Sequence, residues 1–566
     1  ELGTHHALRR LADSLSPAAR TVGASASVLD RTVTIDELAA VADLTAAHVL
    51  DALDELVRRG LMTERSVVEF DVTSVEARSA LLSAVLGARL LGLSARAAEL
   101  VETDVHRRAR LLAHAVPVVS AAVAGEALRR SARLHASEGL HREAAEAYLA
   151  AQHLDPDHGG ADDVIALTRS LDLSGAGQRA AAERLAAFDA LVATGDHESA
   201  LRLATSGLPE AEPLEGAPAV IEQLLRVDPV RLPGPDQWLR STVLARQCAL
   251  CGRLVEGAAH ADQAAALATT PEHELGAAIA RRMVLSANTP PTDRLAVLAP
   301  LRETARALGP TRWAEFAVLE AVDHYEHGDL DTVRALLDEL DALGHDTPLL
   351  RRWHSMLLRA TLSADDDRLD DAHHLRLDAH RLAVAGGFRE ADIALVGAEF
   401  ATAWLLGRPV EIPASAANAI TGSATAMALA ALTIVTSAAG HADQALQLAE
   451  TVARNVVASP VSGGCAALAM VCDQLRASSD DALVHDARTL LAARGDSLLM
   501  VGAGVVSVGP VARYLAMLTT NEVDRRFHLL AAQRLAERSG SRLWRTIAAR
   551  DLDTLPGTPV HAVRAV

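Results

Sequence analysis

The spacing of apolar residues at the start of the chain predicts a run of short helices. Ser16 followed by Pro17 is typical of a helix N-terminus, with the serine as cap and proline at the first helical position. Thr34 and Glu37 have the spacing of a capping box. We therefore expect a second helix over Ile35–Ala42.

A third helix and a β-ribbon should follow. Thr45 caps a helix that extends to Arg59 and ends at Gly60. The buried stripe of this helix consists of Val49, Leu53 and Leu56. Apolar and polar residues then alternate, as in a half-buried strand, with the apolar positions at Val68, Phe70 and Val72. Three helices followed by a β-ribbon form the order of a winged helix.

The third helix has the wrong charge balance for a DNA reader. A helix in that position would enter the major groove. Three of its outward charged residues are acidic and two are arginines near its C-terminal end, the outward polar set being His48, Asp51, Asp54, Glu55, Arg58 and Arg59. Packing against protein is the favoured role of this module, and DNA binding is the weaker alternative.

A degenerate helical repeat occupies most of the remaining chain. Its clearest copy, Arg130–His158, has glycine at an inter-helix turn and small or aromatic residues at helical offsets after it, at Gly139, Ala144, Tyr148, Ala151 and Pro156. These offsets match the tetratricopeptide (TPR) pattern. Glycine permits the tight turn, alanine lets two helices touch, and proline ends the unit.

Weaker copies keep the glycine and the residue five positions after it. They are Gly195 with Ala200, Gly252 with Gly257, Gly328 with Val333, and Gly440 with Ala445. Proline-rich breaks indicate inserted loops at Leu208–Pro218, Pro229–Pro235 and Pro290–Pro291. The alternative is a general helical bundle with glycine at its helix ends.

Composition strengthens the all-α prediction. Hydrophobic residues make up 50% of the 566 residues, yet aromatics are only 2%, so alanine and leucine carry the apolar content. The net charge of -19 disfavours nucleic-acid binding by the chain as a whole. The chain contains no lysine, which excludes a P-loop or Schiff-base lysine within it.

We expect a cytoplasmic protein with no membrane contact. No signal peptide opens the chain, and no run of about 18 apolar residues occurs. The apolar stretch Ala424–Ala439 contains hydroxyl residues and is interpreted as a buried helix. Four cysteines in so long a chain do not form a disulfide scaffold.

Three short motifs suggest chemistry, and each has a simpler explanation. Cys248 and Cys251 have the spacing of half a zinc site or a redox motif, but a helical setting favours buried small residues. Gly502, Gly504 and Gly509 do not fit the dinucleotide fingerprint, and we expect an inter-helix turn there.

The third motif is a group of histidines, His373, His374 and His380, next to the acidic runs Asp365–Asp367 and Asp370-Asp371. A metal site is possible in principle, but a solvated acidic helix face is the favoured interpretation. No nucleophile elbow or HExxH motif is present. We therefore expect no catalytic residues, no metal, no cofactor in this chain, and no enzyme.

Three stretches resemble the large LuxR-family regulators called LAL regulators, which belong to the signal-transduction ATPases with numerous domains (STAND). Leu15–Arg20 resembles the LSPAAR start of the family's winged helix, Thr34–Leu61 its helix-turn-helix, and Leu530–Leu552 its final repeat. The resemblance implies an AAA-type ATPase before this region and a LuxR-type DNA-binding domain after it. On this resemblance we expect either a regulatory fragment or a degenerate relative of such a regulator.

One departure from the family concerns nucleotide sensing. The family usually has Phe-x-His-Pro-Leu after the wing, whereas here Phe70 is followed by Asp71, and Val72 occupies the histidine position. Sensing of nucleotide state by this module is therefore not expected.

The sequence thus predicts an all-α, TPR-like superhelix preceded by a small winged helix with a short β-wing. The expected domains are a winged-helix module (1–72), connecting helices (73–125), the superhelix (126–555) and a C-terminal tail (556–566). We expect the effector-sensing region of a transcription regulator, with a stand-alone protein-interaction scaffold as the alternative. The effector is expected to be a protein, a peptide or a small molecule, and to contact the scarce aromatic residues Trp313, Tyr325, Trp353, Phe400 and Trp404. The alternative is that these side chains only pack helices against one another.

Overall fold

The protein is almost entirely helical. The computed structural model describes residues 2–206, 217–386, 388, 391–409, 425–461 and 463–554. Two compact units divide the chain, Glu1–Leu203 and Ala204–Val566, which we call the N-terminal and C-terminal units. The division falls inside the expected repeats. The expected domain boundaries at residues 72 and 125 stay predictions, and the expected tail 556–566 lies outside the described residues.

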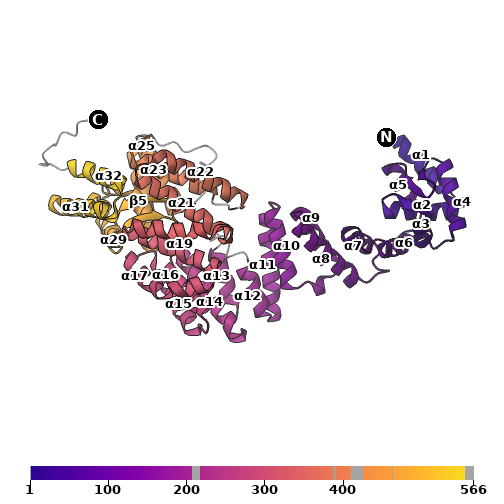
Figure 1. Ribbon diagram of the computed structural model, residues 1–566, viewed down its shortest axis with the longest axis horizontal. Coiled ribbons are helices and arrows are strands. Elements are labelled where there is room, and N and C mark those ends of the chain that lie inside the picture. Colours follow the sequence, from indigo (N-terminus) through magenta and orange to yellow (C-terminus); the bar gives the residue numbers. More distant parts are fainter. Residues whose placement is uncertain are drawn as a thin grey trace. The chain divides into compact units, whose positions relative to one another are not determined.

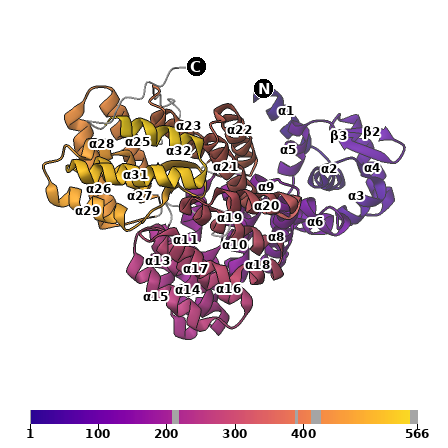
Figure 2. The ribbon, with the colours of Figure 1, turned by 60° about the vertical axis from the view of Figure 1, so that its left-hand side comes forward.

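The N-terminal unit opens with the predicted helices and ribbon (Figure 2). The elements are α1 (Leu2–Asp13), α2 (Pro17–Leu29), β1 (Val33–Thr34), α3 (Ile35–Ala42), α4 (Ala46–Arg58), β2 (Met62–Ser66) and β3 (Glu69–Val72). The antiparallel sheet has the order β1-β3-β2, with Val33 opposite Phe70 and Met62 opposite Val72. Thr34 and Glu37 form the predicted capping box.

One apolar core joins these elements. The predicted stripe of α4 is buried together with Phe70 of β3 and residues of α2. The expected alternation is wrong at Val68, which lies in the turn before β3 and is 53% exposed. The exposed face of α4 carries Asp51 and Asp54, and Arg58 forms an ion pair with Asp54. Arg58, one of the two arginines at this end of α4, is therefore paired with an acid of the same helix.

Helix pairs fill the rest of the N-terminal unit. They are α5 (Val75–Ser83), α6 (Gly87–Leu100), α7 (Val105–His114), α8 (Ala121–Ser137), α9 (His141–Leu154), η1 (Pro156–His158), α10 (Ala161–Leu173), α11 (Gly177–Thr194) and α12 (His197–Thr205), the last of which spans the unit boundary. Gly139 turns the chain between α8 and α9 with a φ of 78°. Ala144, Tyr148 and Ala151 are buried, as the repeat pattern predicts.

The C-terminal unit continues with helices in the same manner (Figure 1). Its first half comprises α13 (Ala217–Arg226), η2 (Pro229–Arg231), α14 (Gly234–Leu250), α15 (Leu254–Leu267), α16 (Pro271–Leu285), α17 (Pro291–Leu298), η3 (Ala299–Leu301), α18 (Arg302–Ala307), α19 (Pro310–His327), α20 (Leu330–Ala342) and η4 (Gly344–Asp346). The predicted break at 229–235 contains η2, and that at 290–291 precedes α17. The break at 208–218 lies mostly outside the described residues.

The second half comprises α21 (Leu349–Asp365), α22 (Leu369–Ala385), α23 (Ala391–Leu405), α25 (Ala426–Ala438), α26 (Ala442–Ala458), α27 (Gly464–Met470), α28 (Cys472–Leu475), α29 (Asp481–Ala492), β4 (Leu498–Val501), β5 (Val506–Pro510), α30 (Val511–Met517), α31 (Glu522–Ser539) and α32 (Arg542–Asp553). The expected buried helix near 424–439 is α25. The glycines at 195, 252, 328 and 440 all have positive φ between paired helices. The glycine turns of the predicted repeat are thereby confirmed, and the chain has an all-α repeat fold.

One prediction in this half is wrong. The glycine-rich segment around Gly502 and Gly504 is not an inter-helix turn but the tip of an antiparallel hairpin, β4·β5, with Leu499 opposite Gly509. The flanking residues are β-branched or large apolar side chains, and a glycine pair suits the left-handed backbone of a hairpin turn. The hairpin is buried and packs against α21, α23 and α31 (Figure 1).

None of the described helices is by itself long and apolar enough to span a membrane. The helix pair α5 and α6 meets that length and composition only when taken together, with a bend of 119° between its members. Both helices contribute buried side chains to the core of the N-terminal unit.

Candidate functional site

The aromatic residues predicted to bind an effector are mostly core residues. Trp313 (5% exposed), Tyr325 (0%), Trp353 (6%) and Phe400 (6%) are buried, and only Trp404 is half-buried. Trp313 and Tyr325 share one apolar cluster, whereas Trp353 packs in a separate cluster. Helix packing accounts for the four buried side chains, and effector binding by the set stays a prediction.

Trp404 lines a cavity in the C-terminal unit. The cavity has a volume of about 190 Å³. Its wall comes from the ends of α23, α27, α28, α30 and α32 and consists of Trp404, Leu405, Gly407, Ala469, Met470, Asp473, Gln474, Arg513, Met517 and Arg550. A cavity of this size holds a compact small molecule, since an engineered apolar cavity of about 150 Å³ accepts benzene.

The polar groups of this cavity differ in how far they are buried and in whether they already have a partner. Arg513 is buried and bound to Asp551, with 2.5 Å between Nε and Oδ2. Arg550 is half-exposed and lies 3.7 Å from the same carboxylate. Among the described residues, the buried Oε1 of Gln474 has no hydrogen-bond partner, although its Nε2 donates to Ser437. A ligand here would meet the free acceptor of Gln474, the half-exposed guanidinium of Arg550, the carboxylate of Asp473 and the ring of Trp404.

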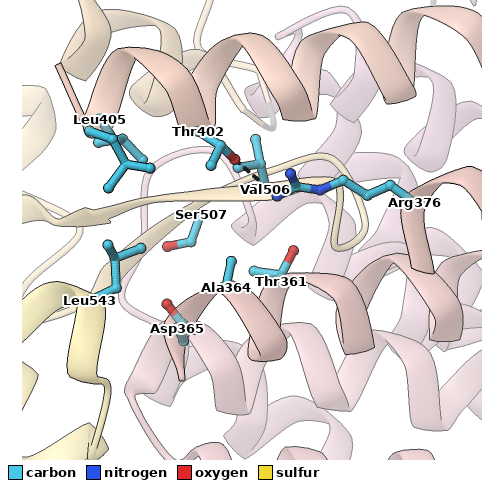
Figure 3. A pocket seen from close by; sticks show the side chains of 10 residues that line it. Thr361, Ala364, Asp365, Arg376, Thr402, Leu405, Val506, Ser507 and Leu543 are labelled. Atoms are coloured by element: carbon cyan, nitrogen blue, oxygen red, sulfur yellow. Dashed lines mark hydrogen bonds between the residues drawn. The ribbon is translucent and has the colours of Figure 1, made fainter. Parts of the chain in front are cut away.

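A second, much smaller cavity lies beside the β5 strand (Figure 3). Its volume is about 10 Å³, close to the least that one water molecule needs. Arg376 reaches it from α22 and donates to Thr402 of α23 at 3.0 Å, while Thr361 of α21 donates to the carbonyl of Gly504 at 3.0 Å. These polar side chains join α22 to α23 and α21 to the hairpin.

Asp365 is the most unusual group in this cavity. It is fully buried at the end of α21, accepts a hydrogen bond from the Tyr325 hydroxyl, and lies 3.4 Å from the donating Ser541 hydroxyl. Burial raises the pKa of its carboxyl to about 7, against the opposing effect of these two hydroxyls. The cavity is water-sized and the Asp365 carboxyl is fully buried, so this group can hold a proton.

A chain of buried ion pairs forms the second charged centre of this unit. Arg282 binds Asp323 through two hydrogen bonds of 2.6 and 2.9 Å, and Arg294 binds the same carboxylate at 2.7 Å. Arg294 also pairs with Glu326, which Arg494 contacts at 2.6 Å. Burial alone would raise the pKa of Glu326, but the charges of Arg294 and Arg494 lower it. This buried network of ion pairs therefore contains three guanidiniums and two carboxylates.

The cysteine motif shows packing rather than chemistry. Cys248 is buried in α14 and Cys251 caps that helix. Burial raises the pKa of the Cys248 thiol to about 11, which disfavours the thiolate that metal binding or redox exchange needs.

The histidine motif of α22 forms hydrogen bonds with carboxylates of the next helix. His373 Nδ1 lies 3.2 Å from Glu399, and His380 Nε2 lies 2.7 Å from Asp392, both on α23. The acidic-run interpretation was wrong for Asp365, which is buried. The signal that could have found it is its spacing from Leu358 and Leu362, which places all three on one face of α21.

Comparison with known proteins identifies no family. A scan against protein-family models matches none, and no curated protein sequence matches the chain. Solved structures with weak similarity exist. One is a signal transduction ATPase with numerous domains (STAND) protein with a tetratricopeptide repeat sensor from Pyrococcus horikoshii, with 11% identity and a TM-score of 0.27; the match covers 85% of this chain and 63% of that one.

Two further structures are similar at the same low level. The APC/C hetero-tetramer Cut9-Hcn1 has 12% identity and a TM-score of 0.26, covering 76% of this chain and 96% of that one. A circular tandem repeat protein has 15% identity and a TM-score of 0.12, covering 97% and 96%. This chain spans less than two thirds of the STAND protein. The assignment to the all-α repeat class rests on the helix pairs themselves.

Proposed function

We propose that this chain is the effector-sensing region of a LAL-type transcription regulator and has no catalytic role of its own. The observation that carries the proposal is the order of elements: a helix–helix–helix–hairpin module on one core, followed by glycine-turned helix pairs. The residues that resemble the family have matching local roles, since Ser16 caps α2 and Ser541 caps α32. In this proposal the N-terminal module is a winged helix that packs against an ATPase domain encoded upstream.

The effector in this proposal is a small molecule in the cavity at Trp404. The volume of about 190 Å³ excludes a folded protein, and the free acceptor of Gln474 together with the Arg550 guanidinium favours a compact polar compound over a purely apolar one. Apart from Trp404, the residues that make this cavity were not found by sequence reasoning, because they come from five helices whose facing sides are set only by the fold.

Ligand binding can be tested by filling the cavity. Ala469 is buried in its wall, so Ala469→Leu places extra methyl groups into the space a ligand would use. The control Ala482→Leu makes the same change at an exposed position of α29. A panel of small amides and carboxylates should include compounds that raise the melting temperature of the wild type and the control but not of Ala469→Leu. Equal shifts in all three proteins would contradict the assignment of the cavity.

The regulatory role can be tested by the surrounding reading frame. A P-loop ATPase encoded upstream and a LuxR-type domain downstream are the expected result. A start codon just before Glu1 and a stop after Val566 would instead favour the alternative, a stand-alone interaction scaffold. The observation that favours this alternative is a pair of exposed apolar side chains, Val123 of α8 (52%) and Leu140 between α8 and α9 (42%).

Direct DNA binding through the hairpin module is the weaker alternative. The acidic face of α4 and the pairing of Arg58 with Asp54 oppose it. No retardation of a DNA probe at low salt is the expected result. A shift that disappears in Arg58→Glu/Arg59→Glu would contradict the packing role of this module.

A further inference from the structure

Two histidines and a glutamate come together where α7 begins and α8 ends. His106 lies in the first turn of α7, His135 in the last turn of α8, and Glu138 caps α8. The imidazole rings stack, with their centroids 3.6 Å apart and 16° between their planes. Their possible metal-binding atoms and a carboxylate oxygen of Glu138 all lie within 4.8 Å of one another. The fold has thus collected three side chains that are up to 32 residues apart in the sequence.

The facing nitrogen atoms have no other role. His106 Nε2 lies 3.6 Å and His135 Nδ1 4.0 Å from the same Glu138 oxygen. Both nitrogens are buried, and neither has a hydrogen-bond partner in the described part of the chain. A buried nitrogen without a partner destabilises the fold, so two at one point need an explanation.

The hydrogen bond on the far side of His106 prepares its ring for a metal. His106 Nδ1 lies 2.8 Å from the hydroxyl oxygen of Ser131. When Nδ1 donates to that oxygen, Nε2 carries a lone pair in the ring plane, and because the rings are stacked one of them has to turn before both lone pairs meet at one ion. Metal-binding histidines in proteins are oriented by this kind of second hydrogen bond.

Two carboxylates lie near the paired rings. Glu138 and Glu143 supply negative charge close to His135, whereas His106 and Arg110 act on it in the opposite sense.

We propose that His106, His135 and Glu138 bind a divalent transition-metal ion of the zinc type, which links α7 to α8. Two imidazoles and one carboxylate form a ligand set that zinc accepts, with water as the fourth ligand. Donor atoms of a tetrahedral zinc site lie about 3.4 Å apart, as follows from zinc–nitrogen distances of about 2.0–2.1 Å. The observed 3.6 and 4.0 Å separations between the histidine nitrogens and the Glu138 oxygen require small shifts, which the half-exposed Glu138 at a helix end permits. Binding also requires one imidazole to rotate out of the stack, so that both in-plane lone pairs point at the ion.

Zinc binding by the full chain, with any purification tag removed and bound metal stripped by a chelator, tests the proposal. Calorimetric titration with Zn²⁺ should reveal one site per chain that is at least about tenfold weaker in His106→Gln and His135→Gln. The control His114→Gln changes an exposed histidine of the same helix and should leave that site intact. Ser131→Ala should weaken it about 10–100-fold, because Ser131 orients a ligand.

Two further measurements keep the result decisive if a histidine variant fails to fold. Glu138→Gln changes a half-exposed side chain and should weaken Zn²⁺ binding without unfolding the protein. Co²⁺ should give the visible absorption of four-coordinate cobalt in the wild type and in His114→Gln, and not in His135→Gln. Zn²⁺ binding that is equal in all variants, or the lack of a one-to-one site in the wild type, would overturn the proposal.

Discussion

The buried chain of ion pairs in the C-terminal unit makes a sharp prediction about charge balance. Asp323 is completely buried and serves both Arg282 and Arg294. Asp323→Asn would leave three buried guanidiniums with Glu326 as their one remaining anion in the chain of pairs. Removing one partner of a buried ion pair typically costs about 3–5 kcal/mol, so we expect a loss of that size in the free energy of unfolding.

Removal of the central cation should be much milder. Arg294→Met would leave Arg282 with Asp323 and Arg494 with Glu326, two matched pairs with no excess charge. Methionine fills much of the volume of the arginine stem, and replacing buried charges by apolar groups is often neutral. We expect a change within about 1.5 kcal/mol.

Urea unfolding followed by tryptophan fluorescence measures this difference. All five tryptophans lie in the C-terminal unit, at residues 238, 313, 353, 404 and 544, so the signal reports on that unit alone. Asp331→Asn, which changes a carboxylate whose side chain is 99% exposed, is the matched control and should leave the midpoint unchanged. Arg294→Met as destabilising as Asp323→Asn would refute the charge-balance argument and indicate that packing dominates.

Three further predictions concern other buried groups. Burial raises the pKa of Asp365 from 3.8 to about 7, so its contribution to the stability of the fold is lost as pH rises through 7. The free energy of unfolding of the wild type should fall by about 1 kcal/mol between pH 6 and pH 8, as measured by urea titrations at the two pH values. Asp365→Asn cannot ionise and should not show this loss. Gly509→Ala should destabilise the fold by about 3 kcal/mol or more, because a methyl group at its φ of 95° would overlap the Trp544 ring. Gly540→Ala has open space around it and should cost about 1 kcal/mol. Equal losses in calorimetry would contradict the steric reason. A thiol reagent should label Cys251 first, since the other three cysteines are buried, and equal labelling rates before unfolding would contradict that burial.

Local signals in the sequence were sufficient for the helices and their turns. The capping box at Thr34 and the glycine at 139 act within a few residues, so neighbouring positions in the sequence are enough to predict the helix start and the turn that they form. The β4·β5 hairpin was missed because its apolar run has no clear period and lies among helices. Neighbouring sequence cannot distinguish such a run from a buried helical segment.

The candidate sites were harder to predict because they depend on distant residues. Asp365 meets Ser541 across 176 positions, and the cavity at Trp404 draws on five separate helices. His106 and His135 lie on different helices, so no spacing rule for a single helix would connect them. The scarcity of aromatics singled out Trp404, which lines this cavity, together with four side chains that fill cores.

The hairpin changes what kind of folding unit the C-terminal repeats form. In an open array each repeat touches only its neighbours, and repeats can unfold one after another. Here Thr361 bonds to Gly504 across 143 residues, and Arg494 bonds to the Ser286 carbonyl across 208. Because these contacts close the repeats on themselves, the C-terminal unit should lose its structure in a single cooperative step. It should also fold more slowly than a repeat array of equal length, because the entropy cost of closing such long loops comes before the stabilising contacts form.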